Sequence, residues 1–320
     1  MFKAELLEKD GLHIIVLSDR SNRIEILPSC GGIMNAWQIM VEGAWKNIVS
    51  GYDDQLDFDN NCEKKGFRGC KLSPYVCRIK DGKYKINELE HTIGKFGFDH
   101  HNIHGLIYNS VFENTSTHSN NTEALASLVH HYKGNDIGYP YKYSIEIKYK
   151  LQSHNQLIIE TKLINHHTEA IPISDGWHPY FTLGSLINDC TLKIKSNTLL
   201  EFDAELIPTG QVIIYSNLFQ DAELINNTVL DNCFVLDPAM EGPACVFADE
   251  VQGIKLEIYP DDSYPYLQIY TPDDRQSIAI ENLSAAPDAF NNNIGLIYLE
   301  PEEEKVFRTK YVFSEVIGNT

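Results

Sequence analysis

Glu281 is the residue whose setting points most directly to chemistry. It directly follows the apolar run Ile278-Ala279-Ile280 and precedes Asn282-Leu283. A carboxylate at the end of a buried strand must be hydrogen-bonded or functional. A carboxylate is ionised at neutral pH, so it can also accept a proton. The segment therefore indicates either a general base or a structural carboxylate that is paired with a cation or faces water, and it leaves both open.

Two histidines are candidates for proton transfer. His178 lies between Trp177 and Pro179 in the aromatic stretch 174–181, and His104 lies in Asn102-Ile103-His104-Gly105-Leu106. An aromatic wall with one titratable group suits a sugar ring and its ring oxygen, and histidine changes charge near physiological pH. Taken alone, each residue is better explained as a core histidine that is hydrogen-bonded to the backbone.

Two further charged residues are candidates for binding. Arg78 has apolar neighbours in the segment 71–79, and an arginine in such a run is usually paired or binds a ligand. Asp231 begins the segment Asp231-Asn232-Cys233-Phe234. These candidates are scattered along the chain, so a fold with many strands and connecting loops would have to collect them in one groove.

The sequence lacks the motifs that hold common cofactors. It contains no glycine-rich phosphate loop, no nucleophile elbow and no HExxH helix. The adjacent pairs His100-His101 and His166-His167 would point to opposite faces of a strand, which predicts isolated surface histidines and no metal site. We therefore expect a reaction that needs no cofactor.

Strict alternation of apolar and polar residues predicts the elements that carry these side chains. In Tyr143–Leu151 every odd position is apolar, and a second run from Leu157 to Ile164 follows after a turn, which predicts a hairpin. Only 53–58 and 286–291 are expected to form short helical turns, and the Asn-rich patches 119–122 and 291–293 are expected to be loops. Shorter strands are predicted at His13–Leu17, Arg23–Leu27, Thr191–Ile194, Ile254–Ile258, Leu267–Tyr270, Ser277–Ile280 and Val306–Phe313. This pattern predicts an all-β fold, a sandwich or a barrel.

Composition narrows the class of protein further. The chain has 320 residues with a formal net charge of -19, which argues against nucleic acid or an anionic membrane surface as a partner. No stretch approaches the roughly 20 apolar residues of a membrane span, and the N-terminal segment does not resemble a secretory signal. Seven cysteines, an odd number without a CxxC pair, favour reduced thiols in a cytoplasmic protein. No linker or repeat is evident, so we expect one domain over residues 1–320, as a monomer or homodimer.

Taken in order, these segments resemble the aldose 1-epimerase (galactose mutarotase) family. The resemblance covers roughly Ser18 to Phe313, and six weak motifs in sequence make it specific. The motifs are the Pro-aromatic and Arg-Ile elements of LSPYVCRI, the Asn-x-x-His-Gly-like NIHGL, Gly138-Tyr139-Pro140, the His-Pro-Tyr-Phe of DGWHPYF, the Glu-x-x-x-x-Pro-Asp-Ala of IENLSAAPDAF, and YLEP with TKYVF. Gly105-Leu106, Cys77 and Asn282-Leu283-Ser284 depart from the family pattern, which indicates a divergent branch.

The resemblance implies a fold, a reaction and a set of roles. The fold is a large antiparallel β-sandwich, and the activity is that of a cofactor-independent isomerase acting on a free aldohexose. Glu281 would be the general base, His178 the general acid, and His104 a catalytic residue at the ring oxygen. Arg78, Asp231 and Asn102 would bind sugar hydroxyls. A hexose-6-phosphate 1-epimerase and a non-catalytic carbohydrate-binding protein of the same fold are the alternatives.

Overall fold

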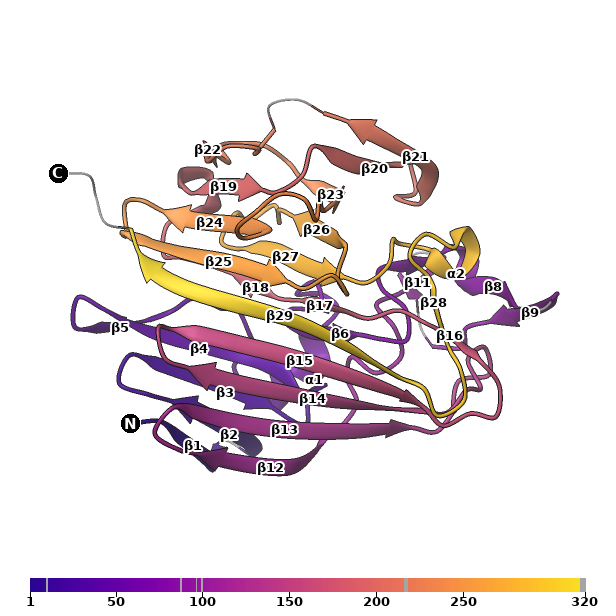
Figure 1. Cartoon of the computed structure of the whole chain (residues 1–320), viewed down its shortest axis with the longest axis horizontal. Helices are drawn as coiled ribbons and strands as arrows, with labels where there is room; N and C mark the ends of the chain where they lie inside the picture. The colour runs from indigo at the N-terminus through magenta and orange to yellow at the C-terminus, as the bar shows by residue number, and fades with distance from the viewer. Residues whose placement is uncertain (10, 87, 96, 99, 216–217, 317–320) are drawn as a thin grey trace.

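The computed structural model confirms the all-β prediction. It describes residues 1–9, 11–86, 88–95, 97–98, 100–215 and 218–316. Long antiparallel strands stack in layers across the molecule, with shorter strands and a few helical turns at one end (Figure 1). The seven cysteines are buried and unpaired.

The largest sheet has nine strands among the described residues. It contains the predicted hairpin of β14 and β15, whose registered pairs run from Tyr143 with Asn165 to Gln152 with Gln156. Alternate side chains of β14 and β15 are buried, as the sequence pattern predicted. The strand order is β12 (Glu113–Ser119), β13 (Glu123–Tyr132), β14 (Tyr143–Gln152), β15 (Gln156–Asn165), β29 (Glu304–Glu315), β25 (Ile254–Pro260), β24 (Cys245–Asp249), β19 (Thr191–Ile194) and β22 (Glu223–Leu224).

A second, N-terminal sheet lies against the first. It consists of β1 (Lys3–Lys9), β2 (Leu12–Ser18), β3 (Asn22–Leu27), β4 (Ile33–Val41) and β5 (Ala44–Asn47). Strands β1 and β2 contact β12, β13 and β14, so the two sheets pack face to face. One continuous apolar cluster fills the space and includes Trp37, Ile147 and Tyr149, which are all fully buried. This packing is that of a β-sandwich.

A third sheet, of eight strands, carries three of the six candidate residues, Asp231, Glu281 and His178. Its order is β21 (Pro208–Ile214), β20 (Thr198–Phe202), β23 (Asp231–Val235), β26 (Tyr266–Tyr270), β27 (Ile278–Leu283), β17 (Gly176–His178) and β6 (Cys70–Leu72), and β18 (Tyr180–Phe181) also pairs with β27. Trp177, Ile269 and Ile280 from this sheet belong to the same apolar cluster as the sandwich core. The core therefore holds in place the strands that carry these three candidate residues.

Short elements complete the described chain. A small sheet joins β10 (Gly97–Phe98), β11 (His101–Ile103) and β7 (Arg78–Ile79), and two-stranded pairs join β16 (Ile171–Ile173) with β28 (Ile297–Leu299) and β8 (Lys83–Ile86) with β9 (Leu89–Thr92). The helical turns are α1 (Gln55–Asn61), α2 (Ala289–Asn292), η1 (Lys80–Gly82) and η2 (Ile187–Asp189). The helical turn predicted over 286–291 overlaps α2, which also includes Asn292, a residue predicted only in a loop. Among the described residues, no helix is long and apolar enough to cross a membrane.

Candidate active site

Four neighbouring strands of the eight-stranded sheet form the floor of the candidate site. Asp231 begins β23, Gln268 lies in the middle of β26, Glu281 lies on β27, and His178 ends β17. Gln268 pairs directly with Glu281, and Asp231 pairs with Tyr270. Because directly paired residues and residues two positions apart share a face of a sheet, these side chains point to the same side.

A hydrogen bond fixes two of these side chains relative to each other. The Gln268 Nε2 donates to Asp231 Oδ1 at 2.6 Å. The Gln268 Oε1 is buried and has no hydrogen-bond partner among the described residues. Buried polar atoms are rarely left unpaired, so this oxygen is available to a ligand hydroxyl.

The small sheet forms a second wall. Arg78 begins β7, and His104 directly follows β11, with a backbone φ of +61° and its N–H donating to the Cys77 carbonyl at 2.8 Å. The next residue must be glycine, since a Cβ on Gly105 would lie 2.2 Å from the Ser73 carbonyl oxygen. The His104 ring packs edge-on against the His178 ring, with centroids 4.9 Å apart.

The segment 63–68 forms a third wall. The Phe67 ring packs edge-on against His104, with centroids 4.7 Å apart. The Arg68 guanidinium lies 5.6 Å from the centroid of Tyr180, whose ring in turn stacks on His178. Stacking of this kind fixes the orientation of the imidazole and leaves its edge free.

These walls enclose a cavity of about 520 Å³, a size typical of small-molecule sites. It is lined by Glu63, Lys64, Lys65, Gly66, Phe67, Arg68, Cys77, Arg78, Ile103, His104, His178, Tyr180, Asp231, Gln268, Tyr270, Pro272, Asp273, Asp274 and Glu281. Among the predicted residues, Glu281, His178, His104, Arg78 and Asp231 all lie here. The cavity thus combines aromatic surface with convergent polar groups.

The two predicted proton-transfer residues are direct neighbours. The His178 Nε2 lies 3.3 Å from Glu281 Oε1, and the side chains are only 7% and 3% exposed. The opposite atoms, His178 Nδ1 and Glu281 Oε2, find no hydrogen-bond partner among the described residues, nor does His104 Nδ1. This pair is placed to pass a proton, and its remaining polar atoms are unsatisfied within the protein.

Burial changes the protonation that the sequence predicted for this pair. Desolvation lowers the pKa of His178 from 6.5 to about 3, and it lowers the pKa of His104 well below its ordinary value. Desolvation, and then the negative charge of Asp231, raise the pKa of Glu281 well above its ordinary value, while Arg78 lowers it by less. Burial therefore disfavours an ionised Glu281 beside a protonated histidine in the free protein and favours a pair that shares one proton, with less charge on either group.

Asn102, the remaining predicted residue, lies outside the cavity. Its side chain donates a hydrogen bond to the Lys95 carbonyl, and it does not line the cavity. Its amide oxygen occupies the space beside Gly82 that a Cβ there would need. From this geometry, Asn102 supports the small sheet that carries Arg78 and His104, through its register pair with Ile79.

Sequence reasoning missed Gln268, and in the segment 63–68 it considered only Arg68, as part of the hexose-6-phosphate epimerase alternative. Gln268 occupies a polar position in a short strand, which resembles any strand residue with a solvent-facing side chain. Its place beside Glu281 depends on the register between β26 and β27, which the sequence alone does not display. The run Glu63-Lys64-Lys65-Gly66 resembles an ordinary charged loop, and only its neighbours in space identify it as part of the site.

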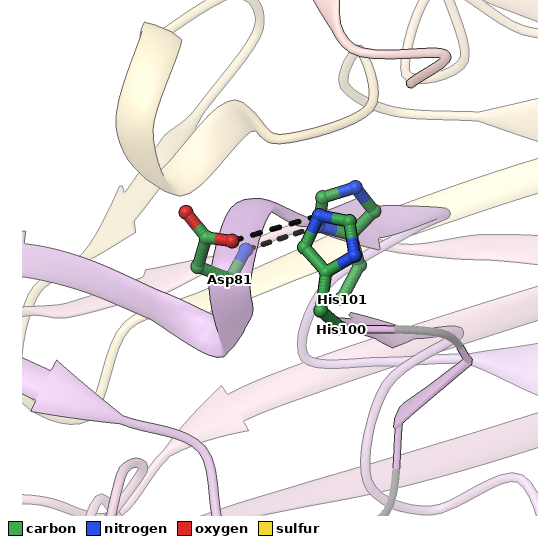
Figure 2. Close-up of side chains that lie close together, drawn as sticks. All are labelled: Asp81, His100 and His101. Carbon is green, nitrogen blue, oxygen red and sulfur yellow. Dashed lines mark hydrogen bonds and ion pairs between the residues drawn. The ribbon is translucent and has the colours of Figure 1, made fainter.

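One cluster could in principle hold a metal ion outside the cavity. Asp81, His100 and His101 place one ligand atom each within 4.8 Å of one another (Figure 2). The prediction that the adjacent histidines point apart is wrong: their ring centroids are 4.0 Å apart, because His100 precedes β11 and the strand alternation does not apply to it. His101 is buried, however, and its Nδ1 already accepts the Asp81 backbone N–H at 3.0 Å. Its Nε2 has no hydrogen-bond partner among the described residues, and none of these three residues lines the cavity.

Solved structures share this fold. A galactose mutarotase-like protein from Clostridium acetobutylicum superposes with a TM-score of 0.85 at 20% identity, covering 98% of each chain. A galactose 1-epimerase from Lactobacillus acidophilus superposes with a TM-score of 0.83 at 18% identity, covering 98% of this chain and 99% of that one. The architecture is therefore the galactose mutarotase-like β-sandwich.

Sequence comparison identifies the family. The model of the aldose 1-epimerase family matches residues 13–312, so the chain belongs to that family. It is 26% identical over 286 residues to the aldose 1-epimerase of Streptococcus thermophilus, covering 79% of this chain and 80% of that protein. It is also 26% identical over 241 residues to the uncharacterized protein YihR of Escherichia coli K12, covering 72% and 74% of the two chains.

Proposed function

We propose that this protein is an aldose 1-epimerase that interconverts the α and β anomers of a free hexose. The observation that carries the proposal is the 3.3 Å approach of His178 Nε2 to Glu281 Oε1 at the wall of the cavity. Ring opening of a hemiacetal needs one group to take the proton of the C1 hydroxyl and another to protonate the ring oxygen. A carboxyl–imidazole pair that holds one proton supplies both.

The reaction starts from the shared proton. Moving it from Glu281 to His178 creates a carboxylate and an imidazolium side by side, the reactive form of the pair. The Glu281 carboxylate accepts the C1 hydroxyl proton while His178 donates to the ring oxygen, which opens the ring to the free aldehyde. His104 packs on His178 and is the second candidate donor to the ring oxygen.

Reclosure reverses these roles. Rotation about the C1–C2 bond presents the other face of the carbonyl to the C5 hydroxyl. His178 then takes the C5 hydroxyl proton, and Glu281 returns its proton to the carbonyl oxygen. The protein ends as it began. Arg78 would donate to ring hydroxyls, and Asp231, held by Gln268, would accept from them.

Charge in the cavity favours a neutral sugar over a sugar phosphate. The lining contains the carboxyl groups of Glu63, Asp231, Asp273, Asp274 and Glu281 against the cations of Lys64, Lys65, Arg68 and Arg78. Arg68, the residue most suited to a phosphate, already lies 3.9 Å from Asp274. Phosphate recognition prefers clustered arginines free of competing carboxylates.

We also infer that the chain acts as one domain over residues 1–320 in the cytoplasm. One apolar cluster spans strands from all three large sheets, which supports a single cooperative unit. The seven buried, unpaired cysteines support a reducing compartment.

Polarimetry tests the proposed activity. Freshly dissolved α-glucose or α-galactose should reach anomeric equilibrium faster with the protein than with the same protein after heat inactivation. Glucose 6-phosphate, followed in parallel, should be accelerated much less, and a preference for it would favour the phosphate-sugar alternative. Sugar binding in calorimetry without any acceleration would identify a non-catalytic binding protein instead.

A further inference from the structure

Cys62 and Cys70 form a close pair of thiols beneath the cavity wall. Their Sγ atoms lie 3.5 Å apart, and both residues are buried, at 6% and 0% exposure. Cys62 directly follows α1 and its N–H donates to the Phe58 carbonyl at 3.0 Å, while Cys70 begins β6. Both residues are therefore held by regular backbone hydrogen bonding on either side of the segment 63–69.

That segment is the third wall of the candidate active site. Glu63, Lys64, Lys65, Gly66, Phe67 and Arg68 all line the cavity. The Gly69 N–H donates to the His178 carbonyl at 2.8 Å, and Cys70 pairs directly with His178 across β6 and β17. A movement of either cysteine is thereby transmitted to His178, and through Phe67 to His104.

Cys62 is also within reach of a small reagent. It lines a separate cavity of about 230 Å³, together with Phe58, Asp59, Asn60, Glu63, Lys64, Tyr108 and Asn109. Its hydrogen bond with Cys70 is the main cause that lowers its thiol pKa, with a contribution from the positive charge of Lys95. Burial raises the pKa of the other cysteines, for instance of Cys30 to about 11 and of Cys190 to about 12. Cys62 is thus the thiol most ready to react as a thiolate.

We propose that Cys62 and Cys70 are a redox-active dithiol, a modification site whose oxidation to a disulfide lowers the activity of the adjoining sugar site. The oxidant is a small disulfide. The Cys62 thiolate attacks one of its sulfurs and expels one small thiol, which leaves a mixed disulfide on Cys62. The Cys70 sulfur then attacks the Cys62 sulfur and passes its proton to the leaving sulfur, which departs as the second small thiol. The two cysteines lose two electrons and two protons, and the oxidant becomes two thiols.

We expect closure of this bond to shift the cavity wall. The sulfurs have to approach from 3.5 Å to about 2.05 Å, a movement of about 1.5 Å. A misplacement of this size near reacting groups can cost up to about 10²-fold in rate, and since only part of it reaches His178 we expect a loss on the order of tenfold. The site of oxidation does not depend on the proposed function; only the effect on activity rests on it.

Peptide mapping of the folded full chain tests the site. After incubation with oxidised glutathione, the intact protein should lose two hydrogens in mass, and proteolysis should yield a peptide linked through Cys62 and Cys70. Cys70→Ser should trap glutathione on Cys62, and Cys62→Ser should show neither product. Cys245→Ala, at a buried cysteine of β24 away from the cavity, is the matched control and should form the same link as the wild type.

Polarimetry on the same samples tests the coupling. Activity should fall on the order of tenfold on oxidation and return with dithiothreitol, and Cys62→Ser should resist the loss. Failure of the wild type to form the Cys62–Cys70 link, or first reaction at another cysteine, would overturn the site. A link that leaves activity unchanged would overturn its coupling to the sugar site. Peptide mapping of the wild type needs no variant. Its result therefore decides the proposed site even if a variant folds poorly.

Discussion

Two buried acid–base pairs lie at opposite ends of the four-residue segment 175–178, and we propose different purposes for them. Asp175 accepts hydrogen bonds from Lys71 Nζ at 2.5 Å and Tyr264 Oη at 2.6 Å, and all three side chains are buried in the core. His178 and Glu281 are buried almost as deeply but line a cavity. Burial alone therefore does not mark a functional pair.

The difference lies in how completely each pair is satisfied. Lys71 Nζ also donates to the Gly176 carbonyl at 3.1 Å and lies 4.5 Å from the centroid of the Trp177 ring, and among the atoms of this pair only Asp175 Oδ2 lacks a partner in the described chain. His178 and Glu281 each leave a polar atom unpaired beside the cavity. We propose that the first pair, which has one unpaired atom and does not line the cavity, fixes the strand, whereas the second, with an unpaired atom on each residue beside the cavity, is available to a substrate.

The largest effect on activity should come from Glu281→Gln, which keeps the shape of the side chain but removes the base. We expect kcat to fall by about 10²–10⁴-fold, with sugar binding retained. Polarimetry measures the rate, and calorimetry measures the binding. A rate near that of the wild type would exclude Glu281 as the base. It would also exclude the proposed difference in role between the two buried pairs.

Asp175→Asn should act on stability instead. It leaves the Lys71 ammonium buried without its counter-charge, and breaking a buried pair in this way typically costs about 3–5 kcal/mol of unfolding free energy. Urea denaturation measures the loss of unfolding free energy. The fraction of Asp175→Asn protein that remains folded should keep most of its activity. The matched control is Glu90→Gln, which removes the exposed ion pair of Lys83 and Glu90 at 3.6 Å and should cost less than about 1 kcal/mol. Equal losses in both variants would refute a structural role for the buried pair.

His178→Asn should lower kcat on the order of 10²-fold, with a smaller change in KM, because the variant loses proton transfer but keeps the cavity. Initial rates at several sugar concentrations separate the two parameters. A change confined to KM would make His178 a binding residue, with His104 as the remaining candidate donor.

The smallest expected effect is on the pH dependence of the unfolding free energy. The unfolded chain protonates His178 below about its ordinary 6.5, whereas burial delays this to about pH 3 in the folded chain, so stability should fall as pH decreases through this window. We expect the wild type to lose about 2–3 kcal/mol more than His178→Asn between pH 7 and pH 4.5. Urea titrations at both pH values test this, and identical losses would contradict the burial effect.

Most of the fold could be predicted because its signal is local. The alternation in Tyr143–Leu151 belongs to β14, and β15 follows as the predicted hairpin partner. The site was predicted only in part. Glu281 and His178 stand out in apolar or aromatic surroundings, whereas the role of Gln268 depends on strand register, and the protonation of the pair depends on burial. Neither strand register nor burial can be predicted from the local sequence alone. The prediction of one domain over residues 1–320 stays a prediction.

The strand order β6–β17–β27 has a consequence for how the chain folds. These three strands come from distant parts of the sequence, and Lys71 and Asp175 alone are 104 positions apart. Hairpins such as β14–β15 can form early from neighbouring residues, but long-range pairs must first close large loops, which is slow. The proposed proton-transfer pair comes together only when β17 and β27 meet. During refolding, the proposed activity should therefore return later than hairpin structure and report the final stage of assembly.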